Sequence, residues 1–192
     1  MAAGASSRLG KPKQLLPYDG QSLLQHALQI AKASNAQSIL IVLGARAELL
    51  KKEIGDNTAH VVVNAAWEEG MASSIRCGIR ALMEMSPTVE AALLMVCDQP
   101  YVTAPLLNDL IAAHQQTGKP IVTCSYENTF GPPTLFHKHL FPELLQLEGD
   151  VGARSVIRQH ANEVEIVLFP KGSIDVDTGA DYEKLTKMDR EP

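Results

Sequence analysis

The chain has 192 residues, of which 45% are hydrophobic and 20% charged, and its formal net charge is −5 at pH 7. This length predicts a single domain over residues 1–192 with a buried core. The negative charge argues against a general nucleic-acid binder, because such proteins are normally basic. Three widely spaced cysteines without metal-site spacing, no signal peptide and no apolar run of bilayer length predict a cytoplasmic protein that binds no membrane.

The first feature in chain order is a loop of small residues that leads into a group of cations. Glycines let a ligand approach the main chain, serine hydroxyls and N–H groups form anion-binding concavities, and arginine grips phosphate through two bonds. The loop runs directly into the apolar Leu15-Leu16-Pro17, which disfavours the alternative of a solvated basic chain end. We therefore expect it to hold a polyphosphate, with these residues involved: Ala2, Ala3, Gly4, Ser6, Arg8, Gly10, Lys11 and Lys13.

Short apolar runs alternate with segments of helical periodicity along most of the chain. This alternation predicts an α/β domain with a mostly parallel sheet, in which ligands bind at the carboxyl ends of the strands. The expected helices cover residues 21–34, 46–54, 71–85, 103–116, 140–147, 151–160 and 179–187. The expected strands cover residues 38–43, 60–63, 91–97, 121–125 and 164–169.

Polar residues follow the second expected strand, where a helix is about to begin. Gly70 allows a base or ribose to come close, and Ser73 and Ser74 with the helix N–H groups can bind polar or anionic ligand groups. Asn64 is a candidate partner for a base edge, although a strand-end asparagine is more often a turn residue. Spacing alone weighs an ordinary serine-capped helix start equally with a nucleotide contact.

An aspartate follows the third expected strand, in the segment Cys97-Asp98-Gln99-Pro100. A carboxylate at the end of a buried strand is costly unless a cation neutralises it. Mg²⁺ is the natural partner beside phosphates, since it is bound by one or two carboxylates plus phosphate oxygens. Asp98 is therefore a candidate metal ligand and catalytic residue, and a turn or helix cap is the alternative.

Two glycine-containing segments follow. Gly131-Pro132-Pro133 begins a rigid, nonhelical stretch that either forms a wall of an acceptor pocket or is a surface turn, which composition alone favours. Gly149-Asp150-Val151-Gly152-Ala153-Arg154 either presents Arg154 and amides to an acceptor phosphate or simply supplies Asp150 as the N-cap of the helix at 151–160.

Acidic and apolar residues alternate near the end of the chain. On an extended backbone Asp175 and Asp177 point to one face, where they repel each other unless a cation lies nearby. A metal is the favoured interpretation beside Asp98, a solvated edge strand is the alternative, and Asp177 also suits a helix cap.

Four of these motifs, in this order, give the chain a resemblance to a known family. The opening loop fits neither the P-loop nor the dinucleotide fingerprint. It resembles the nucleotidyltransferase signature A-A-G-x-S-x-R-x-G-x-x-K, matching at Ala2, Ala3, Gly4, Ser6, Arg8, Gly10 and Lys13. Asp98-Gln99-Pro100 is similar to the MobA-like branch, which attaches a nucleotide to molybdopterin. The resemblance implies a Rossmann-like three-layer α/β/α domain.

One departure from the family concerns the sheet. The family has an apolar strand directly before the loop, and this chain starts with Met1 where that strand would end. Either the sequence is shortened there or the sheet lacks a central strand.

The resemblance implies Mg²⁺-dependent transfer of CMP from CTP to molybdenum-loaded molybdopterin, with release of pyrophosphate. It places Gly70, Ser73 and Ser74 at the nucleotide, Asp175 or Asp177 at the metal, and Gly149, Asp150, Gly152 and Arg154 at the acceptor. Arg8 and Lys13 would offset charge at the α-phosphate and the leaving group. A molybdenum hydroxylase is the expected recipient of the product. The alternatives are a guanylyl or sugar-phosphate nucleotidyltransferase and a non-catalytic molybdopterin-binding chaperone.

Overall fold

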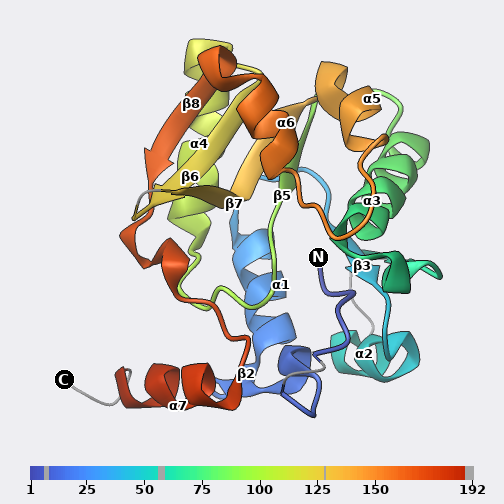
Figure 1. Cartoon of the computed structure of the whole chain (residues 1–192), viewed down its shortest axis with the longest axis vertical. Coiled ribbons are helices and arrows are strands. Elements are labelled where there is room, and N and C mark those ends of the chain that lie inside the picture. Colours follow the sequence, from blue (N-terminus) through green and yellow to red (C-terminus); the bar gives the residue numbers. More distant parts are fainter. Residues whose placement is uncertain (7–8, 56–58, 128, 189–192) are drawn as a thin grey trace.

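The computed structural model describes residues 1–6, 9–55, 59–127 and 129–188 (Figure 1). Its strands are β1 (Pro17–Tyr18), β2 (Gln21–Ser22), β3 (Leu40–Leu43), β4 (His60–Val63), β5 (Ala91–Leu94), β6 (Ile121–Tyr126), β7 (Thr129–His137) and β8 (Val164–Leu168). Its helices are α1 (Leu23–Ala33), α2 (Ala47–Ile54), α3 (Met71–Met85), α4 (Ala104–Thr117), α5 (Phe141–Leu144), α6 (Arg154–Gln159) and α7 (Gly179–Met188). No helix within these ranges combines the length and apolar character that a membrane span requires.

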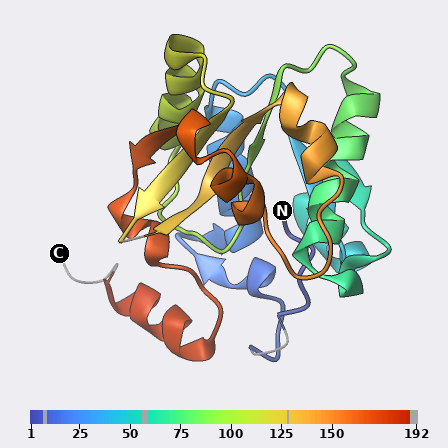
Figure 2. The same ribbon diagram turned by 45° about the horizontal axis from the view of Figure 1, so that its top comes forward.

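Helices cover both faces of the sheet β5-β7-β6-β8, which gives the predicted three layers (Figures 1 and 2). Successive strand residues belong to opposite cores, because strand side chains alternate between faces. Ile121 and Phe136 pack with α3, α5 and α6 on one face. Val122 and Leu135, their chain neighbours, pack with α4 on the other.

The strand pairings are mixed. β3 pairs with β4 and β6 pairs with β8 in parallel, as the alternation of strands and helices predicts. β7 is antiparallel to both of its neighbours, β5 and β6. The segment from Gly131 to Phe136 is nonhelical, as predicted, but the surface-turn alternative is wrong, because the segment lies inside a central strand. Its role as an acceptor wall stays a prediction. The ladder is interrupted where Cys124 pairs with Gly131 and Thr123 with Thr134, so Pro132 and Pro133 fall in a bulge, where proline is tolerated.

The strands β3 and β5 are not paired with each other, and the first three residues of the chain lie between them. The amide of Ala2 donates to the carbonyl of Val42 in β3 (2.9 Å), and the amino group of Met1 donates to the carbonyl of Met95, just after β5 (2.8 Å). In the described residues a single bridge, between Ala2 and Leu43, stands where the family's first strand would end. Within the described residues, β3 and β5 therefore belong to separate sheets.

Two short segments differ from their predicted extents. The helix expected at 151–160 covers only Arg154–Gln159, and the one expected at 140–147 covers Phe141–Leu144 after a 3₁₀ turn. The C-terminal α7 packs against the β1–β2 hairpin, with the hydroxyl of Tyr182 donating to the carbonyl of Pro17 (2.7 Å). Val176 and Leu185 bury with Leu16 and Leu23 there, which anchors the segment that carries Asp175 and Asp177.

Candidate functional site

A buried glutamine shapes the opening loop. The side chain of Gln14 is 1% exposed, and its amide donates to the carbonyls of Ala2 (3.1 Å) and Gly4 (2.9 Å). The hydroxyl of Ser6 accepts from the amide of Lys13 (3.0 Å), so this predicted phosphate contact also closes the loop. Gly10 has a φ of 71°, which favours glycine. Arg8, predicted to bind phosphate, lies outside the described residues.

Lys13 joins the loop to the acidic residues. Its ammonium contacts the carboxylate of Asp98 and lies 2.7 Å from that of Asp177, and the side chains of Lys13 and Asp98 are each 16% exposed. Burial alone would lower the pKa of Lys13, but the charge of Asp98 and the hydrogen bonds to both carboxylates together raise the pKa above its ordinary value. One cation therefore holds together side chains 85 and 164 residues away in sequence.

Asp175 lies at the edge of the same charge cluster. The amide of Val176 donates to the carbonyl of Asp98 (2.9 Å), which aligns the segment 175–177 beside Asp98. Burial, followed by the charges of Asp177 and Asp98, raises the pKa of Asp175. The described residues contain no group of three or more His, Cys, Asp or Glu side chains arranged to hold a metal ion. A divalent ion between Asp98 and Asp177 would take its remaining ligands from phosphate and water.

Asn64 and the serines of α3 form a buried network. The side-chain amide of Asn64 donates to the hydroxyls of Ser73 (2.7 Å) and Ser74 (3.0 Å), and its oxygen accepts from the amide of Ala66 (3.0 Å). The hydroxyl of Ser73 in turn donates to the carbonyl of Gly70 (2.8 Å). Both polar side-chain atoms of Asn64 are thus engaged with the protein. Its pairing with a base edge stays a prediction that would require these bonds to be exchanged.

The loop at 149–152 packs on the start of α3. The carboxylate of Asp150 accepts from the amide of Met71 (3.3 Å), and the carbonyl of Gly149 accepts from the amide of Ala72 (3.2 Å). The interpretation of Asp150 as the cap of its own helix is wrong, because that helix begins only at Arg154. Gly70 permits this contact, since a Cβ there would lie 2.7 Å from the backbone of Asp150 and its φ is 106°.

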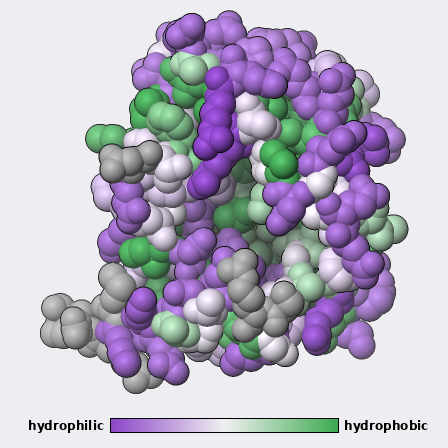
Figure 3. Space-filling view, viewed as in Figure 1, coloured by the Kyte–Doolittle hydropathy of each residue, from purple (hydrophilic) through white to green (hydrophobic). Residues whose placement is uncertain are grey.

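Residues of the opening loop, of the start of α3, of the segment after β5 and of the loop at 149–152 border one cleft of about 500 Å³. The space-filling view shows a hollow near the middle of this face, hydrophobic at its floor and hydrophilic around its rim (Figure 3). The predicted site residues among its lining are Ala2, Ala3, Gly4, Lys13, Gly70, Ser74, Asp98 and Asp150. The predicted site residues that lie outside this lining are Ser6, Gly10, Asn64, Ser73, Gly131, Pro132, Pro133, Gly149, Gly152, Arg154, Asp175 and Asp177.

The remaining acceptor residues lie at two places. A Cβ on Gly131 would meet the hydroxyl of Tyr126 and lie 3.3 Å from the guanidinium of Arg154, so two predicted acceptor contacts are neighbours. Gly152 lies against the sulfur of Met71.

Gln14 and Trp67 are among the lining residues that sequence reasoning did not assign to the site. Trp67 is the only tryptophan of the sequence. It packs close to Gly44, since a Cβ added at Gly44 would lie 2.6 Å from the Cβ of Trp67 and 2.6 Å from the carbonyl oxygen of Ala3. That rarity and its place after a strand are the signals that point to it.

Comparisons with known proteins agree with this geometry. Residues 1–164 match the MobA-like NTP transferase domain. The chain belongs to this family. A curated relative from Paenarthrobacter nicotinovorans, described as nicotine blue oxidoreductase, is 31% identical over 99% of this chain and 93% of its own.

Solved structures give the same family of folds. The Rv0371c homologue from Mycobacterium sp. strain JC1 is 32% identical, with a TM-score of 0.85 over 100% of this chain and 95% of its own. Rv0371c from Mycobacterium tuberculosis H37Rv, solved in complex with manganese, is 29% identical, with a TM-score of 0.79 over 96% of this chain and 94% of its own. The predicted Rossmann-like nucleotidyltransferase fold is therefore confirmed.

We expect Gln14→Leu to destabilise the protein and loosen the loop. The substitution leaves the carbonyls of Ala2 and Gly4 without their donor, and an unsatisfied buried group costs roughly 1–3 kcal/mol. Urea unfolding measures the loss. The same substitution at the exposed Gln29 is the matched control and should change stability little. Equal stability of the two variants would contradict the structural role of Gln14.

We expect Lys13→Met to lower the midpoint of thermal unfolding in metal-free buffer by at least about 4 °C, because the carboxylates of Asp98 and Asp177 then repel each other without a cation. Added Mn²⁺ should restore part of the loss. Lys11→Met, at an exposed position of the same loop, is the control. A midpoint unchanged from wild type would show that the cluster is not held by Lys13.

Proposed function

We propose that this protein transfers CMP from CTP to molybdenum-loaded molybdopterin and releases pyrophosphate. The single observation that carries the proposal is the contact of one loop lysine with both Asp98 and Asp177 at the cleft. This contact brings the opening loop, with its backbone amides and Lys13, to the carboxylates of Asp98 and Asp177. Phosphate transfer to a charged acceptor requires such positioned opposite charges. The family assignment supports nucleotidyl transfer. The opening Ala2-Ala3-Gly4 resembles the cytidylyl branch, whereas guanylyl enzymes more often have a double glycine there, and this resemblance supports CTP.

The reaction needs no strong general base. The phosphate monoester of the acceptor has a second pKa near ~6 and is already a nucleophilic oxyanion at neutral pH. One of its oxygens forms a bond to the α-phosphorus, and the bond from that phosphorus to the bridging oxygen of the β-phosphate breaks. The electron pair leaves with pyrophosphate.

The chain's residues position the reactants and balance charge. The N–H groups and small side chains of the opening loop surround the β- and γ-phosphates, with Gly4 allowing close approach and Arg8 assigned to the phosphates by the signature. The ammonium of Lys13 offsets the charge that builds on the α-phosphate and the leaving group. Gly70 and Ser74, at the start of α3, form the part of the cleft assigned to base and sugar.

Asp98 and Asp177, with Asp175 beside them, are the residues that would hold Mg²⁺. Their fit rests on the fact that both carboxylates already bind one cation, the ammonium of Lys13. When bound, the ion would supply positive charge that offsets the negative charge of the phosphates. The manganese complex of a relative with 29% identity supports a divalent ion in this family.

The acceptor side is assigned to the loop 149–152 and to Arg154. Asp150 borders the cleft and is bonded to the first turn of α3, so acceptor and nucleotide walls meet there. The guanidinium of Arg154 suits a phosphate of the acceptor. A molybdenum hydroxylase would receive the product.

One other function has a specific observation behind it. The name of one relative, nicotine blue oxidoreductase, favours a redox activity, which would require a nicotinamide or flavin that the opening loop does not fit by spacing.

The deciding experiment compares ligands and a metal-site variant. CTP with Mg²⁺ should raise the free energy of unfolding by about 2.7 kcal/mol at one hundred times its Kd, while GTP, ATP, UTP and NADPH should have less effect. Pyrophosphate release with CTP and molybdenum-loaded molybdopterin should fall at least about a hundredfold in Asp98→Ala. Asp109→Ala, exposed on α4, is the matched control.

Each contrary outcome points elsewhere. Stronger stabilisation by GTP would indicate a guanylyl enzyme, and stabilisation by NADPH alone would indicate an oxidoreductase. Tight molybdopterin binding without pyrophosphate release would favour the chaperone. Full turnover of Asp98→Ala would overturn the metal role.

A further inference from the structure

Gln99 is a buried side chain next to Asp98, and its amide joins two distant segments of the chain. The side chain is 7% exposed, and its Nε2 donates to the carbonyl of Gly172 (2.9 Å), 73 residues away in sequence. This bond fixes the orientation of the amide, because only Nε2 can donate to a carbonyl oxygen. The amide therefore ties the segment after β5 to the 3₁₀ turn at Pro170–Ser173.

The other polar atom of this amide, Oε1, has no hydrogen-bond partner. In the part of the chain that the structure describes, it is the one buried side-chain nitrogen or oxygen left without a partner. Burying such an oxygen costs free energy of the same order as a buried hydrogen bond contributes. The unpartnered oxygen and the bond to Gly172 offset each other, so Gln99 adds little net stability. Its contribution is the position at which it holds Gly172.

The turn at Pro170–Ser173 leads from β8 to the segment that carries Asp175. Gly172 is the buried residue of this turn. It packs so closely on Tyr126 that an added Cβ would overlap the tyrosine ring, which requires glycine at this position. Gly172 is thus held between Tyr126 and Gln99, and its position sets where residues 173–177 begin.

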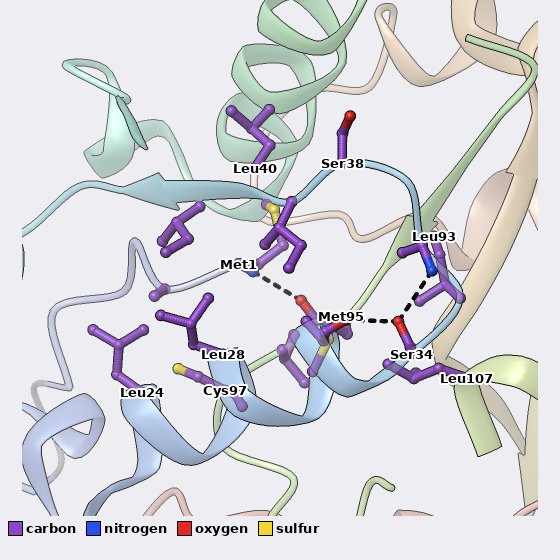
Figure 4. A pocket seen from close by; sticks show the side chains of 17 residues that line it. Met1, Leu24, Leu28, Ser34, Ser38, Leu40, Leu93, Met95, Cys97 and Leu107 are labelled. Carbon is purple, nitrogen blue, oxygen red and sulfur yellow. Dashed lines mark hydrogen bonds between the residues drawn. The ribbon is translucent and has the colours of Figure 1, made fainter. Parts of the chain in front are cut away.

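Asp98, at the other end of these contacts, follows a firmly attached segment. Figure 4 shows that Met95 and Cys97 lie beside helix α1, with the amino group of Met1 donating to the carbonyl of Met95 (2.8 Å). Cys97 is buried and packs with residues of α1 in one core cluster. Because Asp98 is fixed through its chain neighbours, the position of the second acidic segment depends on the bonds that cross to it.

Two such bonds hold the second acidic segment at both of its ends. The amide of Val176 donates to the carbonyl of Asp98 (2.9 Å), and the side chain of Gln99 donates to the carbonyl of Gly172. The acidic residues lie between these two attachment points or directly after them. Mg²⁺ accepts ligands only in a near-ideal octahedral arrangement. This attachment therefore bears directly on whether the carboxylates can share one ion.

We propose that Gln99 is a positioning residue for the divalent ion: its bond to Gly172 holds residues 173–177 so that Asp177 and Asp98 face one ion. The inference rests on the proposed metal role of these carboxylates. It adds a side chain that contacts neither the ion nor a substrate and acts through the segment that carries Asp177.

The test measures the Kd of Mn²⁺ for the full chain without nucleotide or acceptor, from the EPR signal of free Mn²⁺. The midpoint of thermal unfolding in metal-free buffer is measured in parallel. The variant is Gln99→Met, which is similar in size and has no donor. The matched control is Gln25→Met, because the amide of Gln25 also donates to a backbone carbonyl, that of Glu53 (3.2 Å), and does not line the cleft.

Gln99→Met should raise the Kd of Mn²⁺ at least about tenfold. Its midpoint should stay within about 2 °C of wild type, because the substitution exchanges one unpartnered buried oxygen for another, that of Gly172. Gln25→Met should lower the midpoint by about 2–4 °C, since it also removes part of the capping box of α1, and should leave the Kd unchanged.

A Kd of Gln99→Met equal to that of wild type would overturn the positioning role and leave the proposed metal site intact. Equal weakening by Gln25→Met would also overturn it, because lost stability would then explain the effect. If wild type binds no Mn²⁺, the proposed metal role fails together with this inference. If Gln99→Met does not fold, Gln99→Asn takes its place with the same expected rise in Kd, because its shorter amide does not reach Gly172.

Discussion

The attachment of the first three residues to β3 and β5 is the contact on which the site depends. Met1 bonds to one side of the gap, and Ala2 and Ala3 bond to the other. The carbonyls of Ala2 and Gly4 then receive the amide of Gln14, which fixes the loop and the 3₁₀ turn that carries Lys13. A shift of this short segment would therefore move both the opening loop and the ammonium of Lys13 that contacts Asp98 and Asp177.

Charge balance at the cleft follows from the same attachment. Three acidic residues come from two distant segments, and burial of Asp175 together with its acidic neighbours raises the pKa of its carboxyl group. Lys13 brings the opposite charge from a loop that the sheet gap positions. The cluster is stable because positive charge is present, whether an ammonium or a divalent ion supplies it. The same exchange underlies the proposed binding of phosphates and a divalent ion at this cluster.

Local signals in the sequence predicted much of the fold. The helix at Met71–Met85 has the predicted bounds, and Thr103 caps α4 through the amide of Leu106 as its residue type predicts. The strand β7 was missed because a double proline normally excludes a central strand, and only the bulge opposite Thr123 and Cys124 accommodates it. A bulge depends on the partner strand, which a local pattern does not contain.

The sequence predicted which residues belong to the candidate site better than it predicted which of them contact one another. Asp98 was identified from its position after an apolar strand and Asp177 from the alternation of acidic and apolar residues, but their shared partner Lys13 depends on tertiary packing across the chain. One of the two interpretations of Asp150 was the N-cap of its own helix, which local spacing suits, whereas it bonds to the amide of Met71 on a distant helix. Long-range capping of this kind leaves no local signature.

The contact between Asp150 and α3 also gives the cleft a functional constraint. A Cβ added at Gly70 would lie only 2.7 Å from the backbone of Asp150, so the close approach of the two loops requires glycine at this position. The same helix α3 carries the serines that are bonded to Asn64. In the proposed reaction, this contact would place a nucleotide along α3 beside an acceptor along residues 149–154, and in-line attack requires such positioning of two bound substrates.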